Sequence, residues 1–174
     1  MTRRPKPLAE SALYAYALKS LAARACSSGE MRAKLGRRAI RTSDVDVVMR
    51  RLQDVGYLND QRFAESFAAW RVENQRLGRR RVERDLRSRR VAPKLAQRAV
   101  EQAFQDTDES ALLRDHIARR LRRSGPPRDR RAIASLYRHL VGAGFSPSLI
   151  FPELRRLRKE DADWLEEAAA DASD

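Results

Sequence analysis

The sequence has little of what most catalytic and metal-binding sites require. Its 174 residues include one cysteine, Cys26, and two histidines, His116 and His139. A single cysteine cannot form an internal disulfide, and no histidines or cysteines have the spacing of a zinc site. No glycine-rich phosphate loop of the P-loop or dinucleotide type occurs. We therefore expect a protein that is not an enzyme and that uses no cofactor and no metal.

Long apolar runs are also missing. No stretch of 18 apolar residues occurs, so we expect no transmembrane helix and no membrane partner. The N-terminus is basic but lacks an apolar segment of signal-peptide length, which predicts a cytoplasmic protein. Aromatic residues are few and fall mainly at helical spacing, so we interpret them as core residues and expect no base-stacking platform.

Positive charge is what the sequence has in excess. It holds 37 basic and 24 acidic residues, for a formal net charge of +13. Such a charge predicts an anionic partner: nucleic acid, an acidic protein surface or anionic lipid. Lysine occurs only five times, and a GC-rich coding sequence alone favours arginine over lysine. The positions of the arginines therefore carry more information than their number.

Apolar residues recur at helical spacing along most of the chain, and nothing indicates a strand. One pattern repeats without a gap: Leu86, Val91, Pro93 and Leu95 align with Leu140, Phe145, Pro147 and Leu149. Leu35 and Ile40 hold the corresponding places earlier, at a period of about 51 to 54 residues, which is typical of repeat proteins. We predict an all-α fold of tandem three-helix repeats forming an elongated, curved helical array. The alternative is one compact helical bundle.

The predicted organisation has five parts. They are a flexible basic arm (1–10), three-helix repeats at 11–58, 59–106 and 107–158, and an acidic C-terminal tail (159–174). We expect the tail to be either a solubilising segment or a segment that lies across the basic surface and competes with nucleic acid.

The stretch 56–64 is interpreted as the joint between the first two repeats. Gly56 can adopt the left-handed conformation that ends a helix. Tyr57 and Leu58 are expected to pack back onto the core, and Asn59 or Asp60 to cap the next helix. The buried stripe of that helix is predicted from the i, i+4, i+7 spacing of three aromatic residues: Phe63, Phe67 and Trp70.

The same stretch carries a resemblance to a known family. Gly56-Tyr57-Leu58-Asn59-Asp60, followed by Arg62-Phe63-Ala64, resembles the signature of the RecX regulatory proteins. Residues 28–35 are similar to that family's Glu-Leu-Arg-x-Lys-Leu element, with methionine at position 31 in place of leucine. Residues 78–86 resemble its glycine-led basic helix. The structural residues of these motifs are Glu30, Leu35, Gly56, Tyr57, Leu58, Asp60, Phe63, Gly78 and Leu86.

The resemblance implies a regulator of the RecA recombinase. It implies tandem three-helix repeats in an arc that lies in the groove of a RecA filament on single-stranded DNA. There the protein would hinder ATP hydrolysis, strand exchange and co-protease activity. Roles in DNA repair, homologous recombination and the SOS response follow from this.

Arginine clusters supply the candidate contact residues for RecA or DNA. Between residues 71 and 90 there are nine arginines and three acids. Arginine's planar fork pairs with phosphates or carboxylates in two parallel hydrogen bonds. A smaller cluster precedes this segment and another follows it. The candidates are Arg37, Arg38, Arg41, Arg71, Arg76, Arg79, Arg80, Arg81, Arg84, Arg87, Arg119, Arg120, Arg123 and Arg130. The alternative is that they form an ordinary solvated surface.

Two functions from different classes are favoured by the sequence alone, and a generic helical adaptor is a third, weaker alternative. The first is a monomeric regulator that binds RecA and also binds DNA directly without sequence specificity. The second is a stand-alone DNA- or RNA-binding protein of helix-turn-helix type, with 78–90 as its recognition helix.

Overall fold

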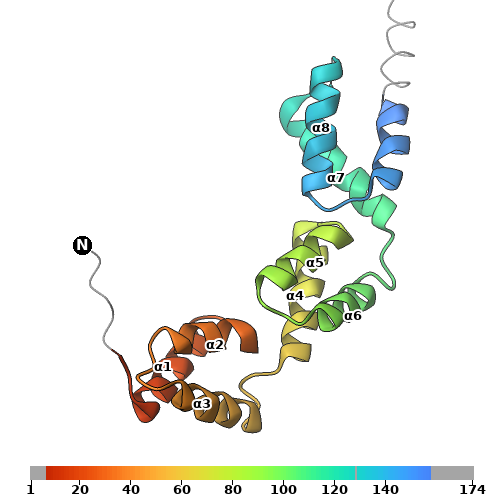
Figure 1. Ribbon diagram of the computed structural model, residues 1–174. Helices are drawn as coiled ribbons and strands as arrows, with labels where there is room; N and C mark the ends of the chain where they lie inside the picture. The colour runs from red at the N-terminus through yellow and green to blue at the C-terminus, as the bar shows by residue number, and fades with distance from the viewer. Residues whose placement is uncertain (1–6, 128, 158–174) are drawn as a thin grey trace, which may run out of the picture. The chain divides into compact units, whose positions relative to one another are not determined.

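The computed structural model describes residues 7–127 and 129–157 of the chain, and this part is helical (Figure 1). A further helical segment at 147–157 follows the last of the labelled helices. The described residues contain no strand beyond an isolated parallel β-bridge between Leu8 and Ala39. The labelled helices are α1 (Glu10–Ala23), α2 (Ser28–Gly36), α3 (Thr42–Asp54), α4 (Asp60–Gln75), α5 (Arg79–Ser88), α6 (Pro93–Ala103), α7 (Glu109–Ser124) and α8 (Arg130–Gly142).

This order of helices confirms the all-α class and the succession of three-helix repeats. The helix ends lie where local chemistry places them. Ser27 and Glu30 form the capping box of α2, with the Glu30 N–H donating to Ser27 Oγ at 3.0 Å. Gly56, at φ +73°, follows the end of α3, and α6 begins at Pro93, whose missing N–H costs nothing in a first turn.

The chain separates into two compact units. The first comprises residues up to Trp70 together with Glu83–Ala103, and the second comprises Arg71–Val82 and the chain from Phe104 onward. Helices α4 and α5 therefore each contribute residues to both units. The predicted repeat boundaries divide the chain differently and stay a prediction.

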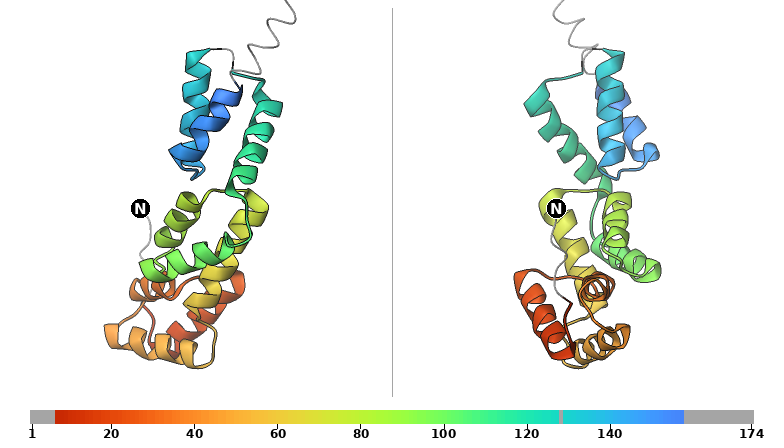
Figure 2. Two further views of the ribbon diagram at one scale, coloured as in Figure 1. Left: turned by 90° about the vertical axis from the view of Figure 1, so that its right-hand side faces the viewer. Right: turned by 60° about the vertical axis from the view of Figure 1, so that its left-hand side comes forward.

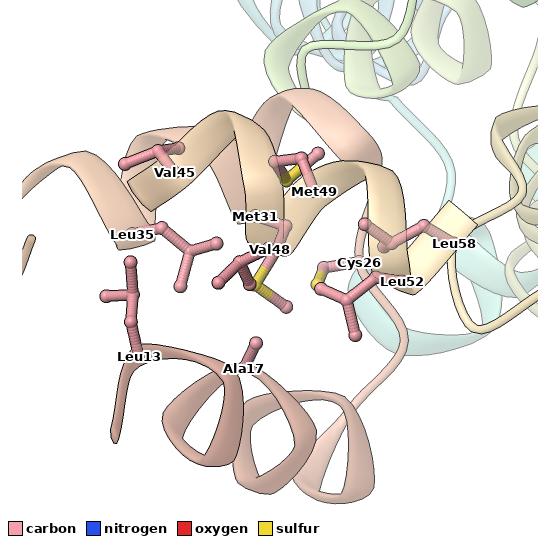
Figure 3. Close-up of a cluster of buried hydrophobic side chains, with 10 residues drawn as sticks. All are labelled: Leu13, Ala17, Cys26, Met31, Leu35, Val45, Val48, Met49, Leu52 and Leu58. Carbon is pink, nitrogen blue, oxygen red and sulfur yellow. The ribbon is translucent and has the colours of Figure 1, made fainter. Parts of the chain in front are cut away.

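The core of the first unit lies among α1, α2 and α3 (Figure 3). Successive turns of the three helices point apolar side chains, mainly leucine, valine and methionine, toward one another, as the periodicity predicts. Leu13, Met31, Leu35 and Leu52 are fully buried there, and Leu58 closes the cluster from the α3–α4 joint. Burying a side chain of this size contributes about 1.5–3 kcal/mol.

Residues at the end of the predicted N-terminal arm are in contact with this core. Leu8 packs against this core, and its N–H donates to the Arg38 carbonyl at 2.6 Å. The Ile40 N–H donates in turn to the Leu8 carbonyl, and α1 already begins at Glu10. Residues 1–6 of the predicted arm and the predicted acidic tail lie outside the described residues.

The predicted aromatic stripe of α4 is wrong. The residues that α4 buries are small: Ala64 and Ala68 are fully buried, and Val72 is 4% exposed. Phe63 and Phe67 are only half-buried, and Trp70 is 50% exposed. The inward face is rotated by about one residue from the prediction, because Ala64, Ala68 and Val72 occupy it in place of the aromatic residues. Tyr57 was also expected to pack inward, but it is 57% exposed.

Helices α7 and α8 and the segment 147–157 lie beside one another in the second unit (Figure 2). Side-chain contacts join the segment to both helices. Arg114 of α7 donates to Glu153 at 3.2 Å, and the ring of Tyr137 in α8 stacks on that of Phe151. Leu113, Leu140 and Ile150 are fully buried, one from each helix.

No helix among the described residues is both long enough and apolar enough to cross a membrane.

Candidate functional site

The N-terminus of α5 meets the C-terminus of α8 in the second unit. The N–H of Gly78 donates to the Ala143 carbonyl at 2.9 Å, and the N–H of Arg80 to the Gly144 carbonyl at 3.2 Å. Arg81 Nη1 donates to the Gly142 carbonyl at 3.1 Å. Free N–H groups at one helix end thus satisfy free carbonyls at another, and the two helix dipoles meet with opposite signs. Gly78 is required here because no side chain fits in this contact.

A similar joint occurs in the first unit, between the start of α2 and the residues that follow α5. Ser27 Oγ donates to the Arg89 carbonyl, and Glu30 accepts from Arg89 Nη1 at 3.3 Å. The Ser28 N–H donates to Asp60 Oδ1 at 2.6 Å, which ties the start of α4 to the same place. Asp60 is thus a link between helices, while Asn59 caps α4 through the Arg62 N–H.

The remaining residues of the predicted structural motif are placed as follows. Leu35, Leu58 and Leu86 are core residues, each at most 4% exposed. Gly56 adopts the predicted positive φ. Phe63 is half-buried at the surface of α4 and stacks on Phe67, with ring centroids 5.9 Å apart.

The predicted arginines of α5 lie on the side opposite its core face. Val82 and Leu86 are fully buried, whereas the side chains of Arg80, Arg84 and Arg87 are exposed. Arg87 pairs with Glu83 at 2.5 Å. Arg80 and Arg84 form no ion pair with a described residue, so their guanidinium groups are available to a partner.

The other predicted arginines divide into groups by their contacts. Five are half-buried, and each contacts another residue of the chain: Arg38, Arg71, Arg76, Arg79 and Arg81. Arg79 exemplifies them, since it pairs with Glu109 at 3.3 Å and lies 4.6 Å above the ring of Phe104. Arg41 and Arg119 are exposed but paired, with Asp44 and Asp115 respectively, at 3.0 Å in each case. Those that are exposed and form no ion pair with a described residue, besides Arg80 and Arg84, are Arg37, Arg120, Arg123 and Arg130.

The two histidines come together between α7 and α8. Their Nε2 atoms lie 3.1 Å apart, and the ring of His116 meets that of Phe145 edge-on. Burial lowers the pKa of His116, and the neighbouring His139 lowers it further. Burial also lowers the pKa of His139, with Arg120 adding to the effect. Within the described ranges no three histidine, cysteine or acidic side chains are placed to hold a metal ion.

A hollow that the sequence did not predict lies beside α4 in the first unit. We call it the aromatic hollow, and its apolar lining comprises Leu21, Cys26, Tyr57, Phe63, Phe67 and Trp70. Burial raises the pKa of the Cys26 thiol in this lining, so the thiol is protonated at neutral pH. The signal missed in the sequence was the pair of small residues Ala64 and Ala68, which marks the inward face of α4 and leaves the rings outside it.

Comparison with known proteins gives one consistent result. Residues 59–100 match the family model described as "RecX, second three-helix domain". The regulatory protein RecX of Deinococcus radiodurans is 37% identical over 159 residues, which cover 89% of this chain and 74% of that protein. The protein of the same description from Streptomyces coelicolor is 31% identical over 130 residues, which cover 74% of this chain and 68% of that protein.

Solved structures share the fold. The crystal structure of RecX from Lactobacillus salivarius matches with a TM-score of 0.70 at 19% identity, over 86% of this chain and 96% of that one. A crystal structure described as regulatory protein RecX matches with a TM-score of 0.65 at 17% identity, over 80% of this chain and 68% of that one.

Proposed function

Because this chain belongs to the RecX family of regulatory proteins, we propose that it regulates RecA by binding the filament that RecA forms on single-stranded DNA. Binding there hinders ATP hydrolysis, strand exchange and co-protease activity. The protein thereby limits homologous recombination and the SOS response. It works in the cytoplasm and acts by contact, without chemistry of its own.

The observation that carries this proposal is the set of exposed arginines without an ion pair to a described residue. Each predicted repeat has at least one: Arg37 in the first, Arg80 and Arg84 in the second, and Arg120, Arg123 and Arg130 in the third. Guanidinium groups bind phosphates and carboxylates through paired hydrogen bonds. Several weak contacts on one chain reinforce each other, because the first raises the effective concentration of the next.

The helix-turn-helix alternative has a specific difficulty. A recognition helix presents its N-terminal residues to the base edges of the major groove. In α5 that end is occupied: Gly78 is buried, and the N–H groups of Gly78 and Arg80 are bonded to Ala143 and Gly144. Arg79 and Arg81 are held by Glu109 and Gly142. The exposed side chains of Arg80 and Arg84 stay available for phosphate contacts, which favours binding of the nucleic-acid backbone over base readout.

The test is charge reversal with a matched control. Arg80→Glu combined with Arg84→Glu reverses two exposed charges of the proposed surface. Arg50→Glu with Arg98→Glu makes the same change in net charge at exposed positions outside it. We expect the first variant to lose binding to RecA filaments and the second to keep it. Equal binding by both double variants contradicts the proposed surface.

A further inference from the structure

The aromatic hollow has the size and lining of a binding site. Its volume is about 500 Å³, and it is bordered by the end of α1, the α3–α4 joint and α4. Clefts of roughly 300–1,000 Å³ with mostly apolar walls and a few polar groups are typical of ligand sites. The hollow is built within the first unit alone.

Two of the aromatic rings that line the hollow keep much of their surface exposed. Helix α4 packs inward through Ala64, Ala68 and Val72. Trp70 at 50% and Tyr57 at 57% keep about half of their surface in water. Keeping apolar surface exposed forgoes about 25 cal/mol for each Å². Tryptophan, tyrosine and arginine are also the residues most enriched where protein interfaces concentrate their binding energy.

Arginines give this apolar hollow a positive edge. Arg24 and Arg89 both pair with the Glu30 carboxylate, at 3.0 and 3.3 Å, so two guanidinium groups share one carboxylate. Arg62 donates to the Gly56 carbonyl at 3.2 Å, which is a neutral partner. No acidic side chain of the described residues contributes to the lining. The excess of positive charge favours a partner group that carries a carboxylate or a phosphate.

The rings favour an inserted side chain over a stacked base. A base needs an open ring face on which to stack. Phe63 and Phe67 are stacked on each other at an interplanar angle of 26°, and Arg89 lies 5.5 Å above the ring of Phe67. These contacts cover part of the faces of both rings, and Leu21 and Cys26 add further apolar groups to the lining. Such a surface fits a leucine or phenylalanine side chain.

We propose that the aromatic hollow binds a segment of a partner protein that carries an apolar side chain next to a carboxylate. The apolar side chain enters the hollow beside Trp70 and the stacked pair Phe63 and Phe67, and the carboxylate pairs with Arg62. This site is separate from the exposed arginines assigned to filament binding. It does not depend on the proposed action on RecA.

The test uses a peptide as the probe and Trp70 as the reporter. The chain has two tryptophans, so Trp164→Phe leaves Trp70 as the only one. The probe is the acetylated and amidated peptide Asp-Glu-Leu-Phe-Asp-Glu, titrated into the full-length protein while Trp70 emission is recorded. The control peptide has two serines in place of the Leu-Phe pair. It keeps the charge of the probe and lacks the apolar side chains that would enter the hollow.

We expect a saturable change in Trp70 emission with the first peptide and none with the serine peptide. Adding Arg62→Glu weakens binding by roughly tenfold or more, since a hydrogen-bonded charge pair is removed. Arg50→Glu is the control, because it makes the same charge change at an exposed position of α3 outside the hollow, and it keeps full affinity. Circular dichroism verifies that the variants are folded.

Three results overturn the proposal. The first is the absence of saturation with the Leu-Phe peptide. The second is equal affinity of the Arg62→Glu and Arg50→Glu variants for it. The third is a saturable response of Trp70 to oligothymidylate at lower concentrations than to the peptide, which would assign the hollow to nucleic acid.

Discussion

The backbones of Gly78 and Gly144 lie so close that a Cβ added to Gly78 would be 2.5 Å from the Gly144 carbonyl carbon. The two residues are 66 positions apart in sequence and join the start of α5 to the end of α8. In the first unit Gly29 stands in the same relation to Arg90, since a Cβ there would be 2.6 Å from the Arg90 carbonyl oxygen. Arg90 and Gly144 both have positive φ, at 60° and 98°. The two units thus contain the same kind of contact, in which a glycine near the start of a helix packs against the backbone of a residue with positive φ.

Gly78→Ala tests this joint by steric conflict. The added methyl group meets backbone atoms, which cannot move without breaking the Gly78–Ala143 hydrogen bond. We expect a decrease of about 1–3 kcal/mol in the free energy of unfolding, measured by urea denaturation. Gly36→Ala is the matched control, since a Cβ there meets nothing within 4 Å, and it stabilises by about 0.4–1 kcal/mol. Equal free energies of unfolding for the two variants would show that the close contact between Gly78 and Gly144 does not contribute to stability.

Asp60→Ala tests the link between α4 and α2. Its carboxylate accepts the Ser28 N–H, and removal leaves this partly buried donor without its partner. We expect the free energy of unfolding to fall by about 1–3 kcal/mol, and by less for Asp60→Asn, whose carbonyl can still accept. Thermal unfolding followed by circular dichroism measures both. If Asp60→Ala costs no more than Asp60→Asn, the hydrogen bond to Ser28 is unimportant.

The histidine pair predicts a pH dependence of stability. His116 and His139 both have a lowered pKa in the folded protein, so the unfolded chain binds more protons as the pH falls below about 6.5. The contribution of the two histidines to the free energy of unfolding is therefore complete above about pH 6.5. It decreases as the pH falls toward the pKa values of the histidines in the folded protein. Urea unfolding at pH 7.5 and 5.5 is expected to show lower stability at pH 5.5.

The double variant His116→Gln with His139→Gln separates this effect from other titrations. It is expected to show a smaller difference between the two pH values than the wild type. At pH 5.5 ordinary carboxylates are still largely ionised, which keeps their contribution small. An unchanged difference in the double variant would assign the pH dependence to other groups.

The exposed arginines of α5 predict a salt dependence of DNA binding. If Arg80 and Arg84 each neutralise a phosphate of single-stranded DNA, log affinity falls with log salt by a slope of about 0.7 per phosphate. Reversing both charges is then expected to make the slope shallower by about twice that amount. Affinity is measured by fluorescence anisotropy with oligothymidylate over a range of salt concentrations. The Arg50→Glu with Arg98→Glu variant corrects for net charge, and an identical slope in the two double variants rules out phosphate binding by Arg80 and Arg84.

Periodicity and local chemistry were sufficient to predict much of the fold. The capping box of Ser27 and Glu30, the helix end at Gly56 and the start of α6 at Pro93 depend on neighbouring residues alone. The pair Leu86 and Val91 recurs as Leu140 and Phe145 at the same spacing, which the sequence also shows. In each pair the later N–H donates to the earlier carbonyl, at 3.2 and 3.3 Å.

Features that depend on distant residues could not be predicted in this way. The sequence indicates a helix break at Gly78, but the partner that requires a glycine there is Gly144. The inward face of α4 was misassigned because large aromatic residues were given precedence over Ala64 and Ala68. All arginines look alike in sequence, whereas contacts such as that of Arg79 with Glu109 separate structural ones from those that are exposed.

The most direct test of action on the filament is the single-stranded-DNA-dependent ATPase of the cognate RecA, measured with substoichiometric amounts of this protein. Its affinity for naked DNA is measured in parallel at the same salt concentration. We predict suppression of ATP hydrolysis at protein concentrations far below those that saturate the DNA, because the protein acts on the filament. Suppression that appears only once the DNA is saturated, or none, would contradict regulation through the filament and indicate simple competition for DNA.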